Sequence, residues 1–115
     1  MDYYSLLHKK LSDGVFVFTA ETTPPDASDK DTLLKKIMPL KGVADAINVT
    51  DSPGANVHMS SLTAAIILAQ NDIDPILQFT VRDRNRLALQ GDLVGASALG
   101  VHNILCLSGD DTKKG

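Results

Sequence analysis

Acidic, hydroxyl and amide side chains stand at the ends of the most apolar runs of this 115-residue chain. The strongest candidate for acid chemistry is Glu21, which directly follows one of these runs. A carboxyl group at the end of a buried strand loses part of its hydration, which raises its pKa toward neutrality and makes it a usable general acid. A solvated loop glutamate, or a negative charge at the start of a helix, would fit this position equally well.

The other three runs end in comparable residues. Thr50 and Asp51 close the second run, Gln78 lies within the third, and Gly109 and Asp110 follow the fourth. A glycine lets the backbone approach a flat ligand closely. Taken alone, the stretches after the second and fourth runs are more typical of turns. Their shared position at the ends of neighbouring strands makes them candidates for a binding site.

Four short apolar runs, rich in β-branched residues and with little strict alternation, predict strands that are buried on both faces, as in parallel sheets. They are residues 15–20, 45–50, 75–81 and 103–108. Helical patterns separate them at residues 30–40, 60–71 and 83–99, and a short amphipathic helix at 3–11 precedes the first strand. This regular alternation predicts an α/β fold whose parallel strands are joined by right-handed crossovers.

Two architectures fit this order of elements. One is a small doubly wound sheet, and the other is the first half of a (β/α)8 barrel, a fold that needs about 250 residues in full. In both, the active site lies at the carboxyl ends of the strands, so the residues named above gather at one rim. A half barrel leaves its first and fourth strands as open edges. The barrel interpretation therefore predicts a chain that is incomplete, or one whose edges something else covers.

The composition excludes several classes of protein. With 43% hydrophobic and 22% charged residues, the chain is typical of one soluble globular domain over residues 1–115, and a disordered tail is excluded. A net charge of −3 argues against a nucleic-acid partner. No apolar run approaches the roughly 20 residues that span a membrane, and the first residues show no secretory signal. We therefore expect a cytoplasmic protein that binds neither nucleic acid nor membrane.

The cysteine and the histidines predict neither a disulfide nor a metal site. Cys106 is the only cysteine, lies in the middle of a predicted strand and is expected to be buried. His8, His58 and His102 are scattered, without the spacing of metal ligands. We therefore expect no bound metal and a reducing compartment.

Three arginines, at positions 82, 84 and 86, stand at the start of the last predicted helix. Together with the helix N-terminus they could hold an anion. Positive charge at that end of a helix opposes the macrodipole, and this small cost points to a specific partner, such as an acid across an interface. A solvated charged face is the simpler interpretation and the one that we favour from the sequence.

Longer segments of the chain resemble methylenetetrahydrofolate reductases. The segments are 78–90 (QFTVRDRNRLALQ), 95–100 (GASALG), 105–111 (LCLSGDD), 20–25 (AETTPP) and 47–51 (INVTD). They occur in the order and at the spacing of that family, from about residue 15 to residue 111. Because the family fold is a flavin-binding (β/α)8 barrel, the resemblance implies that this α/β chain is the N-terminal half of a TIM barrel, with strands one to four.

The resemblance implies FAD as the cofactor and a folate, 5,10-methylenetetrahydrofolate, as the substrate. Such an enzyme passes a hydride from reduced flavin to the one-carbon unit and forms 5-methyltetrahydrofolate, in one-carbon metabolism and methionine biosynthesis. The methylene bridge opens only when the departing nitrogen receives a proton, which a positioned carboxylic acid supplies. The family's acid is the glutamate of its E-x-x-P-P motif, here Glu21.

Further positions carry family roles by the same resemblance. Asp110 corresponds to the family aspartate that lies near flavin and pterin, where it would hydrogen-bond the folate and tune the flavin. Thr50 and Gln78 fall on family positions that touch FAD, and Ser108 and Gly109 fall where a side chain and the backbone meet the cofactor. The catalytic candidates are therefore Glu21 and Asp110, and the cofactor-binding candidates are Thr50, Gln78, Ser108, Gly109 and Asp110.

The chain departs from better-known members of the family at several positions. Two threonines replace an aromatic pair after Glu21, Gln78 stands where histidine is common, and Ser108 stands where arginine is common. These departures indicate a distinct subgroup, in which a separate partner subunit or another electron carrier replaces direct use of NAD(P)H. The expected partners are a folate, NAD(P)H or another electron donor, and further copies of the chain in a homo-oligomer.

The family barrel continues with four more strands, so the resemblance implies an incomplete fragment that is inactive on its own. The main alternative is a non-catalytic α/β half-barrel module that self-associates or pairs with a partner chain. A flavin barrel with another substrate, such as a relative of proline dehydrogenase, is a third interpretation, and the E-x-x-P-P and Gly-Asp motifs argue against it.

Overall fold

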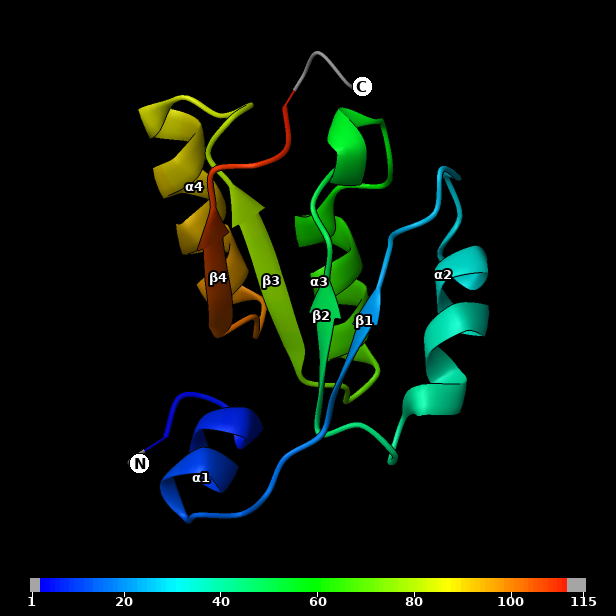
Figure 1. The fold of residues 1–115 in the computed structure, drawn as a ribbon, viewed down its shortest axis with the longest axis vertical. Coiled ribbons are helices and arrows are strands. Elements are labelled where there is room, and N and C mark those ends of the chain that lie inside the picture. The colour runs from blue at the N-terminus through cyan, green and yellow to red at the C-terminus, as the bar shows by residue number, and fades with distance from the viewer. Residues whose placement is uncertain (1–2, 112–115) are drawn as a thin grey trace.

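The computed structural model describes residues 3–111, which contain one sheet of four parallel strands (Figure 1). The strands are β1 (Thr19–Thr22), β2 (Ala46–Val49), β3 (Pro75–Thr80) and β4 (Asn103–Leu107). Each strand pairs in parallel with the next strand along the chain, so their order in the sheet is their order in the sequence. This arrangement confirms the predicted α/β class.

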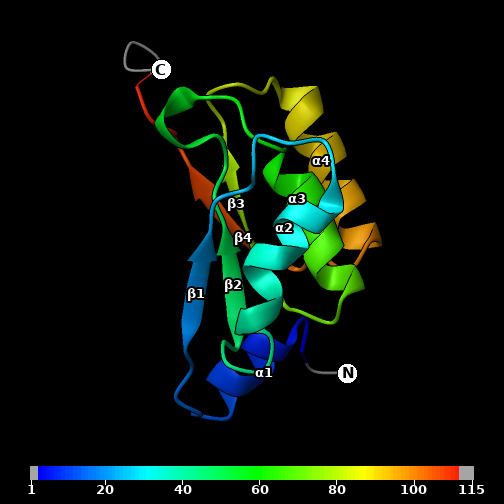
Figure 2. The ribbon, with the colours of Figure 1, turned by 90° about the vertical axis from the view of Figure 1, so that its right-hand side faces the viewer.

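The helices between the strands cover one face of the sheet (Figure 2). They are α2 (Lys30–Ile37), α3 (Ser61–Gln70) and α4 (Arg86–Ala98), with 3-10 turns η1 (Met38–Leu40) and η2 (Pro53–Ala55) in the connections. A doubly wound fold places helices on both faces and reverses its strand order at a switch point. A sheet in sequence order with its crossover helices on one face is instead the pattern of a (β/α)8 barrel. The structure therefore favours the barrel over the doubly wound sheet.

The hydrophobic core lies between the central strands and the helices. The largest fully buried apolar side chains are Leu33, Ile37, Ile47, Val49, Leu68, Leu77 and Phe79. No described helix covers the opposite face, where Asn48, Ile76 and Gln78 are partly exposed. The prediction of strands buried on both faces is therefore wrong for the sheet within residues 3–111. Cys106, predicted to be buried, is also exposed, because β4 is an edge strand of the described sheet.

The first strand begins later than the sequence predicts, at Thr19 rather than at residue 15. Its pairing with β2 starts where Thr19 lies opposite Ala46, and just before it the Asp45 carboxylate accepts the N–H of Phe18 at 2.8 Å. The residues before Phe18 have no strand partner within the described range, and the Phe18 side chain is 65% exposed. Pairing rather than apolar composition sets this boundary, and it places Glu21 inside β1 instead of after it.

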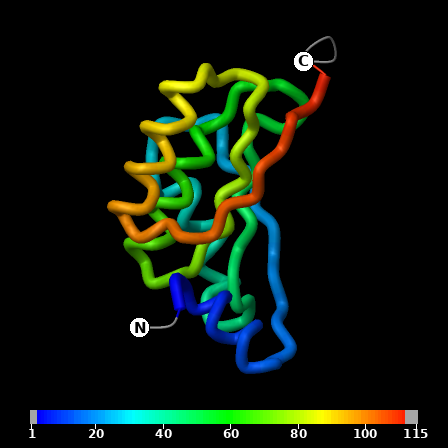
Figure 3. The backbone as a smooth tube through the Cα atoms, turned by 90° about the vertical axis from the view of Figure 1, so that its left-hand side faces the viewer, coloured from blue at the N-terminus to red at the C-terminus, as the bar shows by residue number. Residues whose placement is uncertain are grey.

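The short helix α1 (Leu6–Ser12) lies at the end of the sheet where the strands begin (Figure 1, Figure 3). The Asp74 carboxylate accepts the N–H of Leu7 and the side-chain amide of Asn103, each at 2.9 Å. Ser5 Oγ donates to Asn103 Oδ1 at 2.7 Å. These contacts hold α1 against the starts of β3 and β4, at the end opposite to the carboxyl ends of the strands.

Candidate functional site

A pocket of about 370 Å³ lies at the carboxyl ends of the strands. This volume falls in the range of small-molecule sites, about 300–1,000 Å³. Its lining comprises Glu21, Thr50, Asp51, Pro53, Gln78, Thr80, Leu107, Ser108, Gly109 and Asp110. All the candidate catalytic and cofactor-binding residues from the sequence belong to this lining. The structure therefore brings them together, and their individual roles stay predictions.

Glu21 reaches the pocket from the open face of the edge strand β1. Its chain neighbours Ala20 and Thr22 pack on the helix side, and Glu21 lies opposite Asn48 in the register with β2. Because no described layer covers the open face, the Glu21 side chain is exposed. Of the alternatives that the sequence left open for Glu21, the structure therefore favours a solvated carboxyl group, because partial burial required a strand covered on both faces.

Thr50 provides a buried hydroxyl group without a hydrogen-bond partner. The residue directly follows β2, is 6% exposed, and its N–H donates to Thr22 O at 3.1 Å. Among residues 3–111, Thr50 Oγ1 is the one buried side-chain polar atom that finds no partner. Leaving such a group unsatisfied costs about 1–3 kcal/mol. A hydroxyl of this kind in a pocket wall fits a ligand that supplies the missing hydrogen bond.

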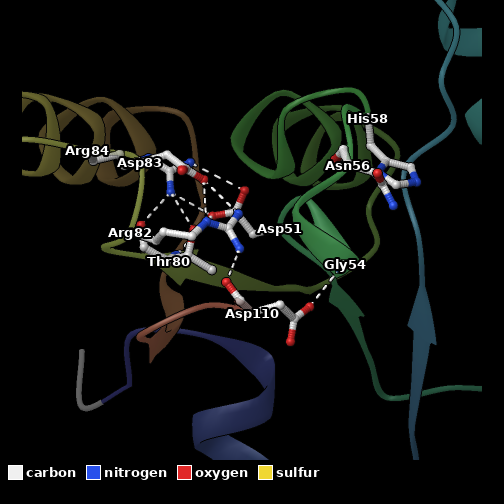
Figure 4. Close-up of polar contacts among 9 residues, drawn as sticks. All are labelled: Asp51, Gly54, Asn56, His58, Thr80, Arg82, Asp83, Arg84 and Asp110. Atoms are coloured by element: carbon white, nitrogen blue, oxygen red, sulfur yellow. Dashed lines mark hydrogen bonds and ion pairs between the residues drawn. The ribbon is translucent and has the colours of Figure 1, made fainter. Parts of the chain in front are cut away.

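Asp51 and Arg84 form a largely buried ion pair in the wall of the pocket (Figure 4). Arg84 Nη1 lies 2.6 Å from Asp51 Oδ2, and the side chains of Arg84 and Asp51 are 14% and 5% exposed. The same carboxylate oxygen accepts the N–H and the hydroxyl of Thr80, at 2.9 and 2.8 Å. Arg84 also lies over the ring of Phe79, 4.5 Å from its centre. The pair thereby joins the end of β2 to the end of β3.

The surroundings of this pair favour the charged form of both groups. Burial would raise the pKa of Asp51, but hydrogen bonds from Arg84 and Thr80 outweigh it and hold the pKa below the ordinary value of 3.8. Burial likewise opposes the charge of Arg84, and the contact with Asp51 outweighs it and raises the pKa of Arg84. Because Arg84 neutralises Asp51, the carboxyl groups of Glu21 and Asp110 account for the remaining acidity of the lining.

The loop after β4 accepts hydrogen bonds from the turn after β2 and from the loop after β3. Asp110 Oδ2 accepts the N–H of Gly54 at 2.7 Å, and Asp110 O accepts Nη1 of Arg82 at 2.9 Å (Figure 4). Gly109 has a φ of +91°, a backbone conformation that favours glycine. A Cβ at this position would lie 3.2 Å from both Cβ and Nη1 of Arg82. Backbone conformation and the Arg82 side chain together therefore require glycine here.

Arg84 is the residue of this site whose role the sequence did not predict. The arginine run did indicate an acidic partner, because positive charge at a helix start is unfavourable. That partner is Asp51 of the same chain rather than an acid across an interface. The favoured interpretation of a solvated charged face is therefore wrong for Arg84.

Fold and pocket together define a class of protein, the barrel-type α/β proteins with a polar ligand site at the carboxyl ends of parallel strands. Residues 6–115, almost the whole chain, match the family described as Methylenetetrahydrofolate reductase, and the chain belongs to this family. This match confirms the resemblance that the sequence motifs indicate. No curated protein sequence gave a match.

Membership of this family defines the general chemistry of the chain. The family comprises oxidoreductases of folate one-carbon metabolism and is generally flavin-dependent. No helix within residues 3–111 is both long enough and apolar enough to cross a membrane.

Proposed function

We propose that this chain forms the first half of a flavin-dependent reductase that converts 5,10-methylenetetrahydrofolate to 5-methyltetrahydrofolate. The observation that carries the proposal is the single pocket that combines the carboxyl groups of Glu21 and Asp110 with the unsatisfied hydroxyl of Thr50. The family to which the chain belongs supports a folate as the substrate. Electrons come from NAD(P)H or from another carrier, which a separate subunit can provide.

The pocket residues suit FAD. Thr50 Oγ1 lacks a partner and can bond to a polar edge of a ring, and Gln78 presents a carboxamide in the same lining. Gly109 lines the same pocket after β4, where its backbone can contact a flat ring, and Ser108 adds a hydroxyl beside it. When bound in its reduced form, the flavin supplies the hydride, while the residues of this chain bind and orient it.

Glu21 is the group that we propose as the general acid. It is the only glutamate of the chain, and its carboxyl group lines the pocket from the open face of β1. Donation of its proton to the departing nitrogen opens the methylene bridge of the substrate. The bridge carbon is then left as an iminium, which accepts the hydride.

Asp110 is the group that we propose to hold the folate ring. A carboxylate accepts hydrogen bonds and has none to donate, so it suits the amino and N–H groups of a pterin. Because Asp51 is neutralised by Arg84, the lining keeps two acidic groups and has no basic residue to offset them. This balance favours a ring rich in N–H donors over a phosphate at this part of the site.

The open face and the open edges of the sheet support the proposal of a half barrel. Leu105 lies opposite Gln78 in the register of β3 and β4 and is 43% exposed on that face. Closing a sheet of eight strands pairs both edges and fills the interior with side chains of this kind. We therefore propose that four further strands complete the barrel and the cofactor site, and that residues 1–115 alone are inactive.

The test uses the complete protein that we propose, in which residues 1–115 form the first half of the barrel. The purified protein should show flavin absorption, and after reduction of the flavin it should convert 5,10-methylenetetrahydrofolate in an anaerobic single-turnover assay. Glu21→Gln should slow this folate half-reaction about a hundredfold or more and leave reduction of the flavin by its electron donor unchanged. Asp26→Asn alters an exposed acid outside the pocket lining and serves as the control.

Two outcomes would contradict the proposal. Unchanged folate reduction by Glu21→Gln would remove this residue from the role of acid. A colourless, monodisperse dimer that takes up no FAD would favour the alternative of a non-catalytic half-barrel module.

A further inference from the structure

Asp110 is held from two sides, by loops that belong to different strands. Its carboxylate contacts the N–H of Gly54 in the turn after β2, and its main-chain oxygen contacts Arg82 in the loop after β3. Since β3 lies between β2 and β4 in the sheet, the contact with Gly54 spans the end of β3 (Figure 4). One residue thus connects the ends of three strands at the pocket.

Arg82 is itself firmly placed. Its Nε and Nη2 donate to Asp83 Oδ2 at 2.9 and 2.6 Å, which leaves Nη1 for Asp110 O at 2.9 Å. Although it lies in a surface loop, its side chain is only 12% exposed. Arg82 packs so closely on Gly109 that a Cβ added to Gly109 would lie 3.2 Å from the Cβ of Arg82. Arg82 therefore contacts both residues of the Gly-Asp motif.

The Asp110 loop needs such support. Residues 108–110 are all exposed, and they follow an edge strand of the described sheet. A surface loop of this kind samples several conformations unless specific contacts select one. The hydrogen bond from Arg82 places the Asp110 backbone, and the hydrogen bond from Gly54 then orients its carboxylate in the lining of the pocket.

We propose that Arg82 is a positioning residue that acts through Asp110 on recognition of the folate. The proposal rests on the function proposed above, in which the Asp110 carboxylate accepts hydrogen bonds from the substrate ring. Arginine suits this role because its planar group of donors binds Asp83 and Asp110 at the same time, which the single ammonium group of lysine does less well.

The first experiment separates folate recognition from flavin reduction in the complete, flavin-loaded protein. Arg82→Met keeps the aliphatic stem and removes the donors, so the KM for 5,10-methylenetetrahydrofolate should rise about tenfold while flavin reduction by the electron donor keeps its rate. Arg86→Met, at an exposed arginine outside the pocket lining, should change neither value. An unchanged KM in Arg82→Met would overturn the proposal.

A double-variant cycle tests whether Arg82 acts through Asp110. In an Asp110→Ala background, Arg82→Met should raise the KM no further, because the group that it positions is already absent. A full, additive tenfold increase in the double variant would overturn the proposal, since Arg82 would then act on the folate by another route.

A second measurement needs neither folate nor turnover. The exchange of the Gly54 N–H with water, followed by NMR on protein with nitrogen-labelled glycine, should become about tenfold faster in Arg82→Met and in Asp110→Ala. Unchanged exchange at Gly54 in folded Arg82→Met would overturn the proposal even in a protein that reduces no folate. Wild-type protein that reduces no folate would overturn the proposed function instead. If Arg82→Met does not fold, Arg82→Gln, which is too short to reach both Asp83 and Asp110, is measured in the same way.

Discussion

Arg84 Nη1 lies 2.6 Å from Asp51 Oδ2, and this contact joins residues 33 positions apart at the ends of β2 and β3. Both side chains are largely shielded from water. Removal of one member of such a pair leaves an uncompensated charge in a poorly hydrated place, whereas replacement of both members by apolar residues removes the charge altogether. The energetic role of the pair therefore appears most clearly when only one partner is changed.

Arg84→Met should lower the free energy of unfolding of the complete protein by about 3 kcal/mol, because Asp51 then keeps its charge without a neighbouring cation and retains only its hydrogen bonds from Thr80. A double variant, Arg84→Met with Asp51→Leu, should lose less than this. Urea unfolding measures both values. Asp83→Asn, at an acid whose side chain is 55% exposed, should cost less than about 1 kcal/mol and serves as the control. If the single and the double variant lose equal amounts of stability, the uncompensated charge of Asp51 is not the cause of the loss.

Lowering the pH should reduce the free energy of unfolding, because Asp51 then becomes protonated. Its native pKa lies below the ordinary value of 3.8, so the unfolded chain binds more protons than the native state as the pH falls. The stabilisation is present above the unfolded pKa and is lost as the pH drops through the native pKa. The free energy of unfolding should therefore fall between about pH 5 and pH 2, and fall less steeply in Asp51→Asn. Identical pH profiles of the two proteins in urea unfolding would contradict this assignment.

The strands of this fold are predictable from the sequence where the apolar pattern covers the same residues that pair with a neighbouring strand. The third strand is predicted at residues 75–81 and found as Pro75–Thr80, because it is central and its apolar residues pack on the helices. The first strand is predicted four residues too early. Its leading apolar residues resemble a strand, but the register with Ala46 determines which residues find a partner.

The lining of the pocket is predictable for a different reason. Carboxyl ends of neighbouring parallel strands meet at one rim, so Thr50 and Asp110 can be placed together without coordinates. The partner of Arg84 cannot be predicted in this way, because nothing local relates position 84 to position 51. The exposure of Glu21 is also beyond the sequence pattern, since it depends on whether another layer covers that face of the sheet.

Thr50→Val removes the unsatisfied hydroxyl and keeps the shape of the side chain. Without flavin, the variant should be as stable as the wild type or more stable by up to about 1 kcal/mol, because no hydrogen bond within the described chain is lost. Its dissociation constant for FAD should rise about tenfold if the hydroxyl bonds to the cofactor. Thermal unfolding of the apoprotein and a flavin fluorescence titration measure the two effects. Thr63→Val, at an exposed threonine of α3, is the control, and a less stable Thr50→Val that binds FAD normally would contradict the prediction.

Gly109→Ala and Gly91→Ala form a matched pair with opposite expected signs. At Gly109 the φ of +91° costs an L-residue about 1–2 kcal/mol, and the new Cβ would lie 3.2 Å from Arg82, so stability should fall. Gly91 lies within α4, where a Cβ meets nothing within 4 Å, so alanine should raise stability by about 0.5–1 kcal/mol. Thermal unfolding of the complete protein measures both changes. Folate affinity should weaken only in Gly109→Ala, because a displaced Arg82 no longer places Asp110, and a Gly109→Ala protein with wild-type stability and folate affinity would contradict this geometry.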